Sequence, residues 1–337
     1  NTRHLDIYRA QIALLDKSWQ TQTLGHARTM DGIEMAAIML GTTPEGLRAR
    51  PVLLGIINTN SPLQLDIPMA EGLIAMAAHG QVVAITPFTL SGAMAPVTLA
   101  GALTLQHAEA LAGIVLTQIV RPGVPVMYGA FTSNVDMRSG SPAFGTPEYT
   151  KAALASGQLA RHIRVPFRSS NVTAANEVDA QAAYESQMAL WGALMGGAHL
   201  LEHAAGWMHG GLTASFEKLI LDAEMLQMMD AFFAPLDVST ATLAVQAIRD
   251  VGPAGHFFGA AHTMERYEHA FYTPILSNWD NHPNWLQNGG VMAREKANTV
   301  WKQLLRDHVD PPLDPGIAEA LDDYVARRKA EGGAPMN

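Results

Sequence analysis

One order of elements recurs along this chain: a short apolar run, a loop that opens with proline, aromatic or polar residues, and then an apolar helix. Residues 81–86 (QVVAIT) lead into Pro87 and Phe88, and a long helical pattern follows. The same order returns at residues 124–131 and 164–171. Apolar runs that alternate with helices predict a parallel sheet covered by helices on both faces. In α/β barrels, the loops that follow such strands build the active site.

The apolar periodicity predicts six strands and nine helices. We expect strands at residues 18–24, 52–57, 81–86, 124–128, 165–168 and 198–202. We expect helices at residues 1–15, 31–40, 69–78, 96–120, 147–162, 179–195, 216–233, 241–251 and 314–328.

A closed barrel of alternating strands and helices needs eight strands. The first expected element of this chain is a helix, so we expect the missing strands to lie before Asn1. The fold class predicted is α/β, a TIM (β/α)8 barrel that lacks its N-terminal strands. The barrel domain is expected over residues 1–310, followed by an exposed helix and tail over residues 311–337.

The composition of the chain limits the kinds of partner and site that this protein can have. Charged residues make up only 16% of the chain and hydrophobic residues 48%, so much of the chain is expected to be buried, in a core or between subunits of a homo-oligomer. A net charge of −9 argues against nucleic acid, because phosphate binding needs clustered Lys and Arg. The absence of cysteine excludes disulfides and thiolate metal sites. No apolar run has the length of a membrane helix, and we expect a cytoplasmic protein with no membrane contact.

Several segments resemble the trimethylamine methyltransferase family, in the same order and over nearly the whole chain. They are residues 61–66 (SPLQLD), 92–103 (GAMAPVTLAGAL), 109–131, 136–148 (DMRSGSPAFGTPE), 178–185, 204–226 and 255–267 (GHFFGAAHTMERY). The resemblance implies a TIM barrel that moves a methyl group from a methylated amine to the Co(I) centre of a separate corrinoid protein. It implies no cofactor bound directly to this chain, because the partner carries the cobalamin.

The family includes archaeal enzymes with pyrrolysine and bacterial relatives with an ordinary residue instead. This chain has only standard residues, so it resembles the bacterial branch and its glycine betaine:corrinoid methyltransferases. The segment that corresponds to the pyrrolysine position is expected near residues 169–175. Methyl transfer from trimethylamine would expel a poor, amide-like anion unless the nitrogen is protonated or covalently captured, whereas a quaternary amine leaves as a neutral tertiary amine.

A site for a quaternary ammonium should present aromatic faces, each contributing about 0.5–2 kcal/mol by cation–π attraction. The candidates, each at an expected strand end or in a loop, are Phe88, Tyr128, Phe131, Trp207, Phe257 and Phe258. The alternative for each ring is packing in the core.

Histidines and a glutamate form a second group of candidates. His256 and His262 flank the loop GHFFGAAH, and either could donate to a substrate carboxylate, face the corrinoid, or satisfy loop backbone groups. His199 and His203 are expected on one face of a strand, with Glu202 on the opposite face. A metal site there lacks a clear third ligand, so we expect Glu202 and His203 to line the barrel mouth instead.

Arg168 at a strand end and Arg138 in a loop could each hold a carboxylate with two hydrogen bonds. For Arg138, an ion pair with Asp136 is the alternative. Three asparagines also follow strands and could orient substrate or form Asx turns: Asn58, Asn60 and Asn171.

Together these features predict a methyltransferase for a quaternary amine, with glycine betaine or a similar betaine favoured. One alternative is a barrel of the same shape that binds a methylated amine without chemistry. Another is an enzyme that acts on a carboxylated amine by unrelated chemistry. Neither a phosphate-binding glycine motif nor a serine nucleophile elbow is present.

Overall fold

The computed structural model describes residues 1–335, and its centre is one parallel sheet of six strands. The strands follow the order β1-β2-β3-β5-β8-β9. Their bounds are β1 Gln20–Thr21, β2 Leu54–Ile57, β3 Val82–Ile85, β5 Val126–Gly129, β8 Phe167–Ser170 and β9 Leu200–Glu202. Each strand lies within or next to one of the six apolar runs, so the predicted strands are confirmed.

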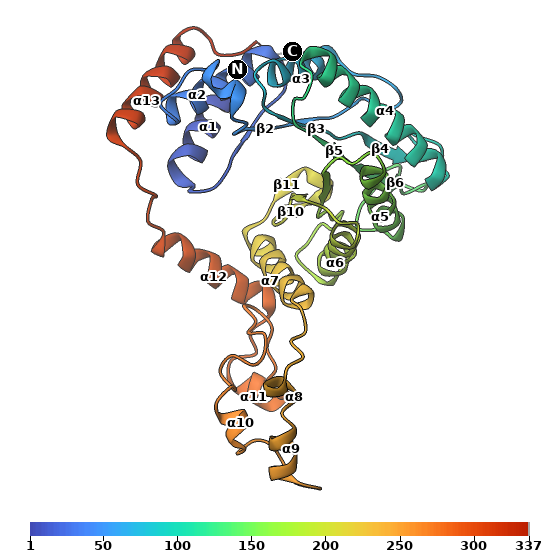
Figure 1. The fold of residues 1–337 in the computed structure, drawn as a ribbon, viewed down its shortest axis with the longest axis vertical. Helices are drawn as coiled ribbons and strands as arrows, with labels where there is room; N and C mark the ends of the chain where they lie inside the picture. Colours follow the sequence, from blue (N-terminus) through green and yellow to red (C-terminus); the bar gives the residue numbers. More distant parts are fainter. Residues whose placement is uncertain (336–337) are drawn as a thin grey trace.

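The sheet curls into an arc, with helices on its outer side (Figure 1). Among the described residues its two edge strands do not pair with each other. Gln20 on β1 nevertheless donates a side-chain hydrogen bond of 2.7 Å to Glu202 on β9, 182 positions later. The two edges therefore approach each other across the concave side. This half-barrel is consistent with a TIM-like fold, and the complete eight-stranded barrel stays a prediction.

Helices cover the outer side of the sheet, the first of them before the first strand and the others after a strand. They are α1 Arg3–Leu14, α2 His26–Met39, α3 Ile67–Ala78, α4 Leu99–Val120, α5 Pro147–His162, α6 Ala180–Met195 and α7 Phe216–Phe233. Local sequence fixes several starts: the Asp66 side chain accepts a hydrogen bond of 2.8 Å from Met69 N, with Pro68 in the first turn of α3. The main core lies between the sheet and these helices and includes Ile57, Val83 and Ile85.

A second layer of short strands lies beyond the ends of β3 and β5. Strands β4 Phe88–Ser91, β6 Phe131–Val135 and β7 Pro142–Ala143 form one small sheet, and β10 Trp207–Met208 pairs with β11 Thr213–Ala214 in another. Residues 88–91 were expected to be a loop, and none of these five strands was predicted from the sequence. The register of β4 on β6 sets Phe88 opposite Phe131.

Residues 234–292 form an arm that projects away from the sheet, seen below α7 in Figure 1. It contains α8 Thr240–Leu243, α9 Val245–Val251, α10 Ala261–Met264 and α11 His282–Gln287. The single helix predicted over residues 241–251 is interrupted at Ala244, whose φ is +48°. Helix α12 Ala293–Asp307, which the sequence analysis missed, returns along α7.

The last helix, α13 Pro315–Ala330, is not simply exposed as predicted, because one of its faces packs on α1 and α2. Leu321 is fully buried, and the Tyr324 hydroxyl donates to Asp31 Oδ1 on α2 at 2.8 Å. Arg328 Nε donates to the same carboxylate at 2.7 Å. The helix therefore closes the N-terminal side of the domain, beside the start of the chain.

One helix of the described residues, α4, is long and apolar enough to cross a membrane by length and composition. The core helix of a soluble protein passes the same test. Buried polar groups occur on α4: Gln106 is fully buried and bonds Ser156 and Tyr128, and Glu109 accepts hydrogen bonds from Ser61 and from Leu63 N. In the most apolar stretch of 18 residues of α4, 28% of the residues are buried, and Val115 and Ile119 on this helix are exposed.

Candidate functional site

A cavity of about 680 Å³ opens at the carboxyl ends of β1, β2, β8 and β9, which is where α/β barrels place their sites. We call it the mouth cavity. Its lining comes from β-strand ends, from the second layer and from the loop after β2: Gln20, Ile56, Asn58, Thr59, Asn60, Ser61, Phe88, Met94, Phe131, Phe144, Arg168, Glu202, His203, Trp207, Gly210 and Gly211.

Aromatic rings form a continuous wall of the mouth cavity. Phe88 lies 5.3 Å from Phe131, Phe131 lies 5.6 Å from Phe144, and Phe144 lies 5.2 Å from Trp207, measured between ring centroids. The imidazole of His203 stacks on Trp207 at 5.3 Å and an interplanar angle of 23°. The wall therefore offers several π faces to one volume, as a site for an organic cation requires.

Phe144 is the member of this wall that the sequence analysis missed. It follows β7, an edge of the second layer, and no apolar run or helical period marks its position. Gly211 is also needed there, because a Cβ at this position would lie 2.5 Å from the Trp207 ring and its φ is +95°. A larger residue would displace the indole from the wall.

His203 and Glu202 both line the mouth cavity, so the predicted alternation of these two residues across a strand is wrong. The reason is local: β9 ends at Glu202, and His203 has a φ of +53°. Burial, with the nearby Arg168 charge adding to it, lowers the pKa of His203 to about 3. The imidazole is therefore neutral at pH 7.

His199, by contrast, lies before β9 and accepts a hydrogen bond from Phe167 N at 3.1 Å. It does not share a face with His203. No three His, Asp or Glu side chains among residues 1–335 are grouped so that they could hold a metal ion.

Arg168 is the most unusual side chain of the site. It is 2% exposed, and neither Nε nor Nη1 has a hydrogen-bond partner. Its closest acid is Glu202, whose Oε2 lies 4.0 Å from Nε and is itself unpartnered, while Glu202 Oε1 accepts from Gln20. The guanidinium carbon lies 5.9 Å from the Phe131 centroid. Burial lowers the Arg168 pKa, but a guanidinium stays protonated at neutral pH.

Unmade hydrogen bonds at a buried cation cost free energy, about 1–3 kcal/mol or more for each group left unpaired. A buried cation without hydrogen-bond partners is expected where a bound ligand supplies the missing acceptors. An anionic ligand group beside Arg168 would supply acceptors for Nε and Nη1.

Two predicted residues have structural roles close to the site. Tyr128 is fully buried, and its hydroxyl lies 3.1 Å from both Gln106 Nε2 and His107 Nδ1, so this ring belongs to the core and not to the cavity wall. Asn171 is also buried and donates to Ala204 O at 3.0 Å. Its side chain supports the loop after β9 and does not line the cavity.

Asn58 and Asn60 do line the cavity, although their amides are occupied by the protein. Asn58 donates to Thr86 O at 2.8 Å, and Asn60 bonds both the backbone and the carboxylate of Asp66. Asn60 therefore has a structural role, but its bond spans six residues and is not the expected Asx turn.

The remaining candidates lie away from the mouth cavity. His256, Phe257, Phe258 and His262 belong to the arm, and Phe258 is 87% exposed. Arg138 lies in an exposed loop, where its backbone N–H, not its guanidinium, bonds Asp136 at 3.3 Å. The structure does not bring these five residues to the aromatic wall.

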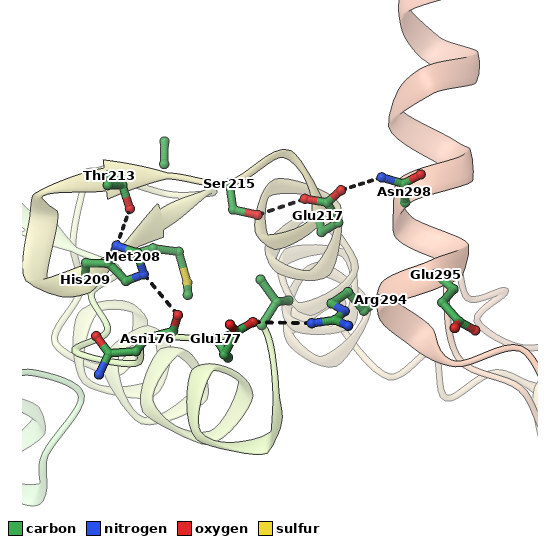
Figure 2. A pocket seen from close by; sticks show the side chains of 12 residues that line it. Asn176, Glu177, Met208, His209, Thr213, Ser215, Glu217, Arg294, Glu295 and Asn298 are labelled. Atoms are coloured by element: carbon green, nitrogen blue, oxygen red, sulfur yellow. Dashed lines mark hydrogen bonds and ion pairs between the residues drawn. The ribbon is translucent and has the colours of Figure 1, made fainter.

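A second cavity of about 700 Å³ lies between the β10–β11 hairpin and α12 (Figure 2). Its charged groups are matched within the protein: Arg294 pairs with Glu177 at 3.3 Å, and Glu217 accepts from Asn298 and Trp301. The hydrogen bonds from Asn298 and Trp301 lower the pKa of Glu217 to about 2. Because these groups already have partners, this cavity lacks buried polar atoms without a hydrogen-bond partner, such as those of Arg168 and Glu202 in the mouth cavity.

A buried ion pair supports the aromatic wall from behind. Lys218 on α7 is fully buried and donates to Asp222 one turn later and to Ser186 at 2.7 Å. The other oxygen of Asp222 accepts from Gly206 N at 2.8 Å, directly before Trp207. This pair was not predicted, although a lysine and an aspartate at i and i+4 within an apolar helix are a signal that the sequence contains.

Comparison with known proteins identifies the family of this chain. The family model described as "Trimethylamine methyltransferase (MTTB)" matches residues 1–333. The chain is 38% identical over 332 residues to a glycine betaine methyltransferase of Desulfitobacterium hafniense, covering 98% of this chain and 69% of that protein. It is 30% identical over 302 residues to a trimethylamine methyltransferase of another strain of that species, covering 89% and 60%.

An archaeal relative matches to a similar extent. A trimethylamine methyltransferase of Methanosarcina mazei is 30% identical over 296 residues, covering 87% of this chain and 59% of that protein. The chain thus spans between 59% and 69% of the length of these relatives. With a family match over nearly its whole length, this chain belongs to the trimethylamine methyltransferase family, a family of methyltransferase enzymes.

Proposed function

We propose that the protein transfers a methyl group from a carboxylated quaternary amine, with glycine betaine favoured, to the Co(I) centre of a separate corrinoid protein. The family assignment supports methyl transfer from a methylated amine. The name of the D. hafniense relative supports glycine betaine as the donor. The mouth cavity is the proposed donor site.

The buried and unpartnered guanidinium of Arg168 beside the aromatic wall is the observation that carries this proposal. A betaine has a fixed positive charge and a carboxylate only a few bonds apart. Its carboxylate would accept hydrogen bonds from Arg168 Nε and Nη1, and its trimethylammonium head would lie against Phe131 and Trp207. Simple cations such as choline would meet the Arg168 charge without a compensating carboxylate.

The neutral state of His203 and the free oxygen of Glu202 favour the same ligand. A neutral imidazole stacked on Trp207 adds a π face without adding charge. The unpartnered Glu202 Oε2 adds a negative charge to the same cavity. Together these groups would offset the desolvation of the ammonium head.

In the proposed reaction, one N–CH3 bond of the betaine breaks and its electron pair stays on nitrogen, so the amine leaves neutral. The new bond to the methyl carbon forms with the electron pair of the acceptor, which supplies the nucleophile. The chain's own residues bind the substrate, aim one methyl outward and exclude water. No general acid is required, which agrees with a wall made mainly of aromatic rings.

The test is methyl-corrinoid formation, followed by absorbance, from glycine betaine, carnitine, proline betaine, choline and trimethylamine at equal concentration. Glycine betaine or another carboxylated betaine is expected to be the best donor. Trimethylamine as the best donor would contradict the quaternary amine, and choline as the best would contradict the carboxylate half. Tight betaine binding without methyl transfer to any corrinoid protein would favour a barrel that binds but does not catalyse.

A further inference from the structure

The loop after β2 forms one part of the wall of the mouth cavity, and a buried carboxylate of α4 holds this loop in place. Glu109 is 3% exposed and lies in the middle of α4. Its Oε2 accepts hydrogen bonds from the hydroxyls of Thr59 and Ser61, and its Oε1 accepts one from Leu63 N at 2.7 Å. Thr59 and Ser61 also line the mouth cavity. One carboxylate therefore fixes two hydroxyls that a ligand in this cavity would meet.

Packing alone does not hold the loop after β2. A cavity of about 220 Å³ lies between this loop, the ends of β2 and β3, and α4, and its lining is mainly apolar. Leu63 of the loop is itself 71% exposed. A loop beside an unfilled space has fewer van der Waals contacts than one in a close-packed core. The positions of Thr59 and Ser61 therefore depend on their hydrogen bonds to Glu109.

The direction of these hydrogen bonds decides what the loop offers to a ligand. A carboxylate has acceptors and no donor, so both hydroxyls turn their hydrogens toward Glu109. The oxygens of Thr59 and Ser61 are then available to the cavity only through their lone pairs. The amide nitrogen of Asn58, in the same lining, donates to Thr86 O, which leaves the amide oxygen free. This side of the mouth cavity therefore presents partial negative charge.

We propose that Glu109 is a positioning residue that makes the loop after β2 select a cationic ligand head. The inference rests on the proposed function, because it needs a methylated ammonium group in the mouth cavity. The N-methyl hydrogens of such a head carry part of its positive charge and can contact the oxygens of Thr59 and Ser61. Glu109 does not line the cavity and acts through these two hydroxyls. The head is thus recognised by oxygen atoms from the loop as well as by the aromatic wall.

The substitution Glu109→Gln tests this role because it reverses the hydrogen bonds while keeping the shape of the side chain. Leu63 N can only donate, so the amide oxygen must face it. The amide nitrogen then faces Thr59 and Ser61 and donates to their oxygens. Their lone pairs are occupied, and their hydrogens turn elsewhere. The loop of this variant no longer favours a cation.

Calorimetry with a matched pair of ligands measures the effect. Glycine betaine and 3,3-dimethylbutanoate have the same shape and the same carboxylate, but only the betaine has a positive charge. The ratio of their dissociation constants measures recognition of the charged head, and a general loosening of the site cancels in it. Glu109→Gln is expected to lower the preference for betaine about 3- to 10-fold. Thr59→Val removes one hydroxyl and should lower this preference as well, whereas Thr59→Ser should retain it.

Glu185→Gln is the matched control for the loss of a buried carboxylate that holds a loop. Glu185 accepts hydrogen bonds from the Thr173 hydroxyl, Ala174 N and Ala175 N after β8, and these three residues do not line the mouth cavity. This variant should leave the preference for betaine unchanged.

Two results would overturn the role of Glu109 in different ways. If the unmodified protein binds betaine no more tightly than 3,3-dimethylbutanoate, both this role and the proposed donor site are wrong. If the unmodified protein prefers betaine but Glu109→Gln and Thr59→Val leave that preference unchanged, or Glu185→Gln lowers it equally, only the role of Glu109 is wrong.

Discussion

The proposed role of Arg168 can be tested by replacing its charge while keeping its bulk, as in Arg168→Met. Two charge-assisted hydrogen bonds to a substrate carboxylate, each about 1.5–3 kcal/mol, would be lost. Allowing for partial replacement by water, we expect a loss of about 3 kcal/mol in binding glycine betaine. That corresponds to a dissociation constant about 100-fold higher.

Choline should respond in the opposite direction or not at all. A cation bound to the aromatic wall lies about 6–10 Å from the guanidinium, so their repulsion is roughly 1–3 kcal/mol at an effective dielectric constant of 20. Removing Arg168 relieves this repulsion. Arg168→Met is therefore expected to bind choline at least as tightly as the unmodified protein.

Isothermal titration of both ligands measures these effects without a corrinoid protein. Arg138→Met is the control, because Arg138 lies in an exposed loop away from the cavity and both affinities should stay unchanged. Arg168→Met leaves Glu202 without its ion-pair partner at 4.0 Å, so the variant is expected to be less stable, and the contrast between betaine and choline in the same variant separates this loss from the carboxylate contact. Equal weakening of betaine and choline would refute the carboxylate role, as would unchanged betaine binding.

Three further predictions concern the wall and its support. Trp207→Leu should raise the dissociation constants of betaine and choline alike, about 2- to 30-fold, because both would lose a cation–π contact; calorimetry that shows an effect on betaine alone would contradict this. His203 binds a proton below about pH 6.5 in the unfolded chain but only near pH 3 in the folded one, so the folded state should lose about 2 kcal/mol of stability between pH 7.5 and 5. In His203→Asn this loss should be absent, which urea unfolding at the two pH values measures. Asp222→Asn should cost about 3 kcal/mol in urea unfolding by leaving Lys218 buried and unpaired, and the double variant Lys218→Met/Asp222→Leu should cost less.

The sheet could be predicted because its strands are short apolar runs between turn residues, and burial on both faces leaves little choice of residue. Val83, Ala84 and Ile85 on β3 are all fully buried, for example. The second layer could not be predicted in this way. Strand β4 follows β3 after only two residues, Thr86 and Pro87, so the pattern of residues 88–91 resembles a loop.

The candidate site could be predicted only as far as the strand-end rule applies. That rule brings Phe88 and Phe131 together, since each stands just beyond the end of a parallel strand, whereas Arg168 is the second residue of β8 and not at its end as expected. It gives no information on how far a long connection extends from the sheet, which is why Phe258 was misplaced. The prediction that Tyr128 lines the site was wrong for a different reason. Tyr128 is the third residue of its strand, and its side chain points to the helix side of the sheet, where Gln106 donates a hydrogen bond to its hydroxyl.

The hydrogen bond between Gln20 and Glu202 has a consequence for folding. Its two residues are 182 positions apart and belong to the first and last strands of the arc, so the mouth cavity exists only after every intervening strand has been added. Contacts between such distant parts of a chain form late in folding, because the chain must lose the conformational entropy of the intervening loop before the contact can stabilise it. A ligand held between these edges would bind the native arc and not its partly folded forms, so binding would stabilise the whole sheet and not one loop.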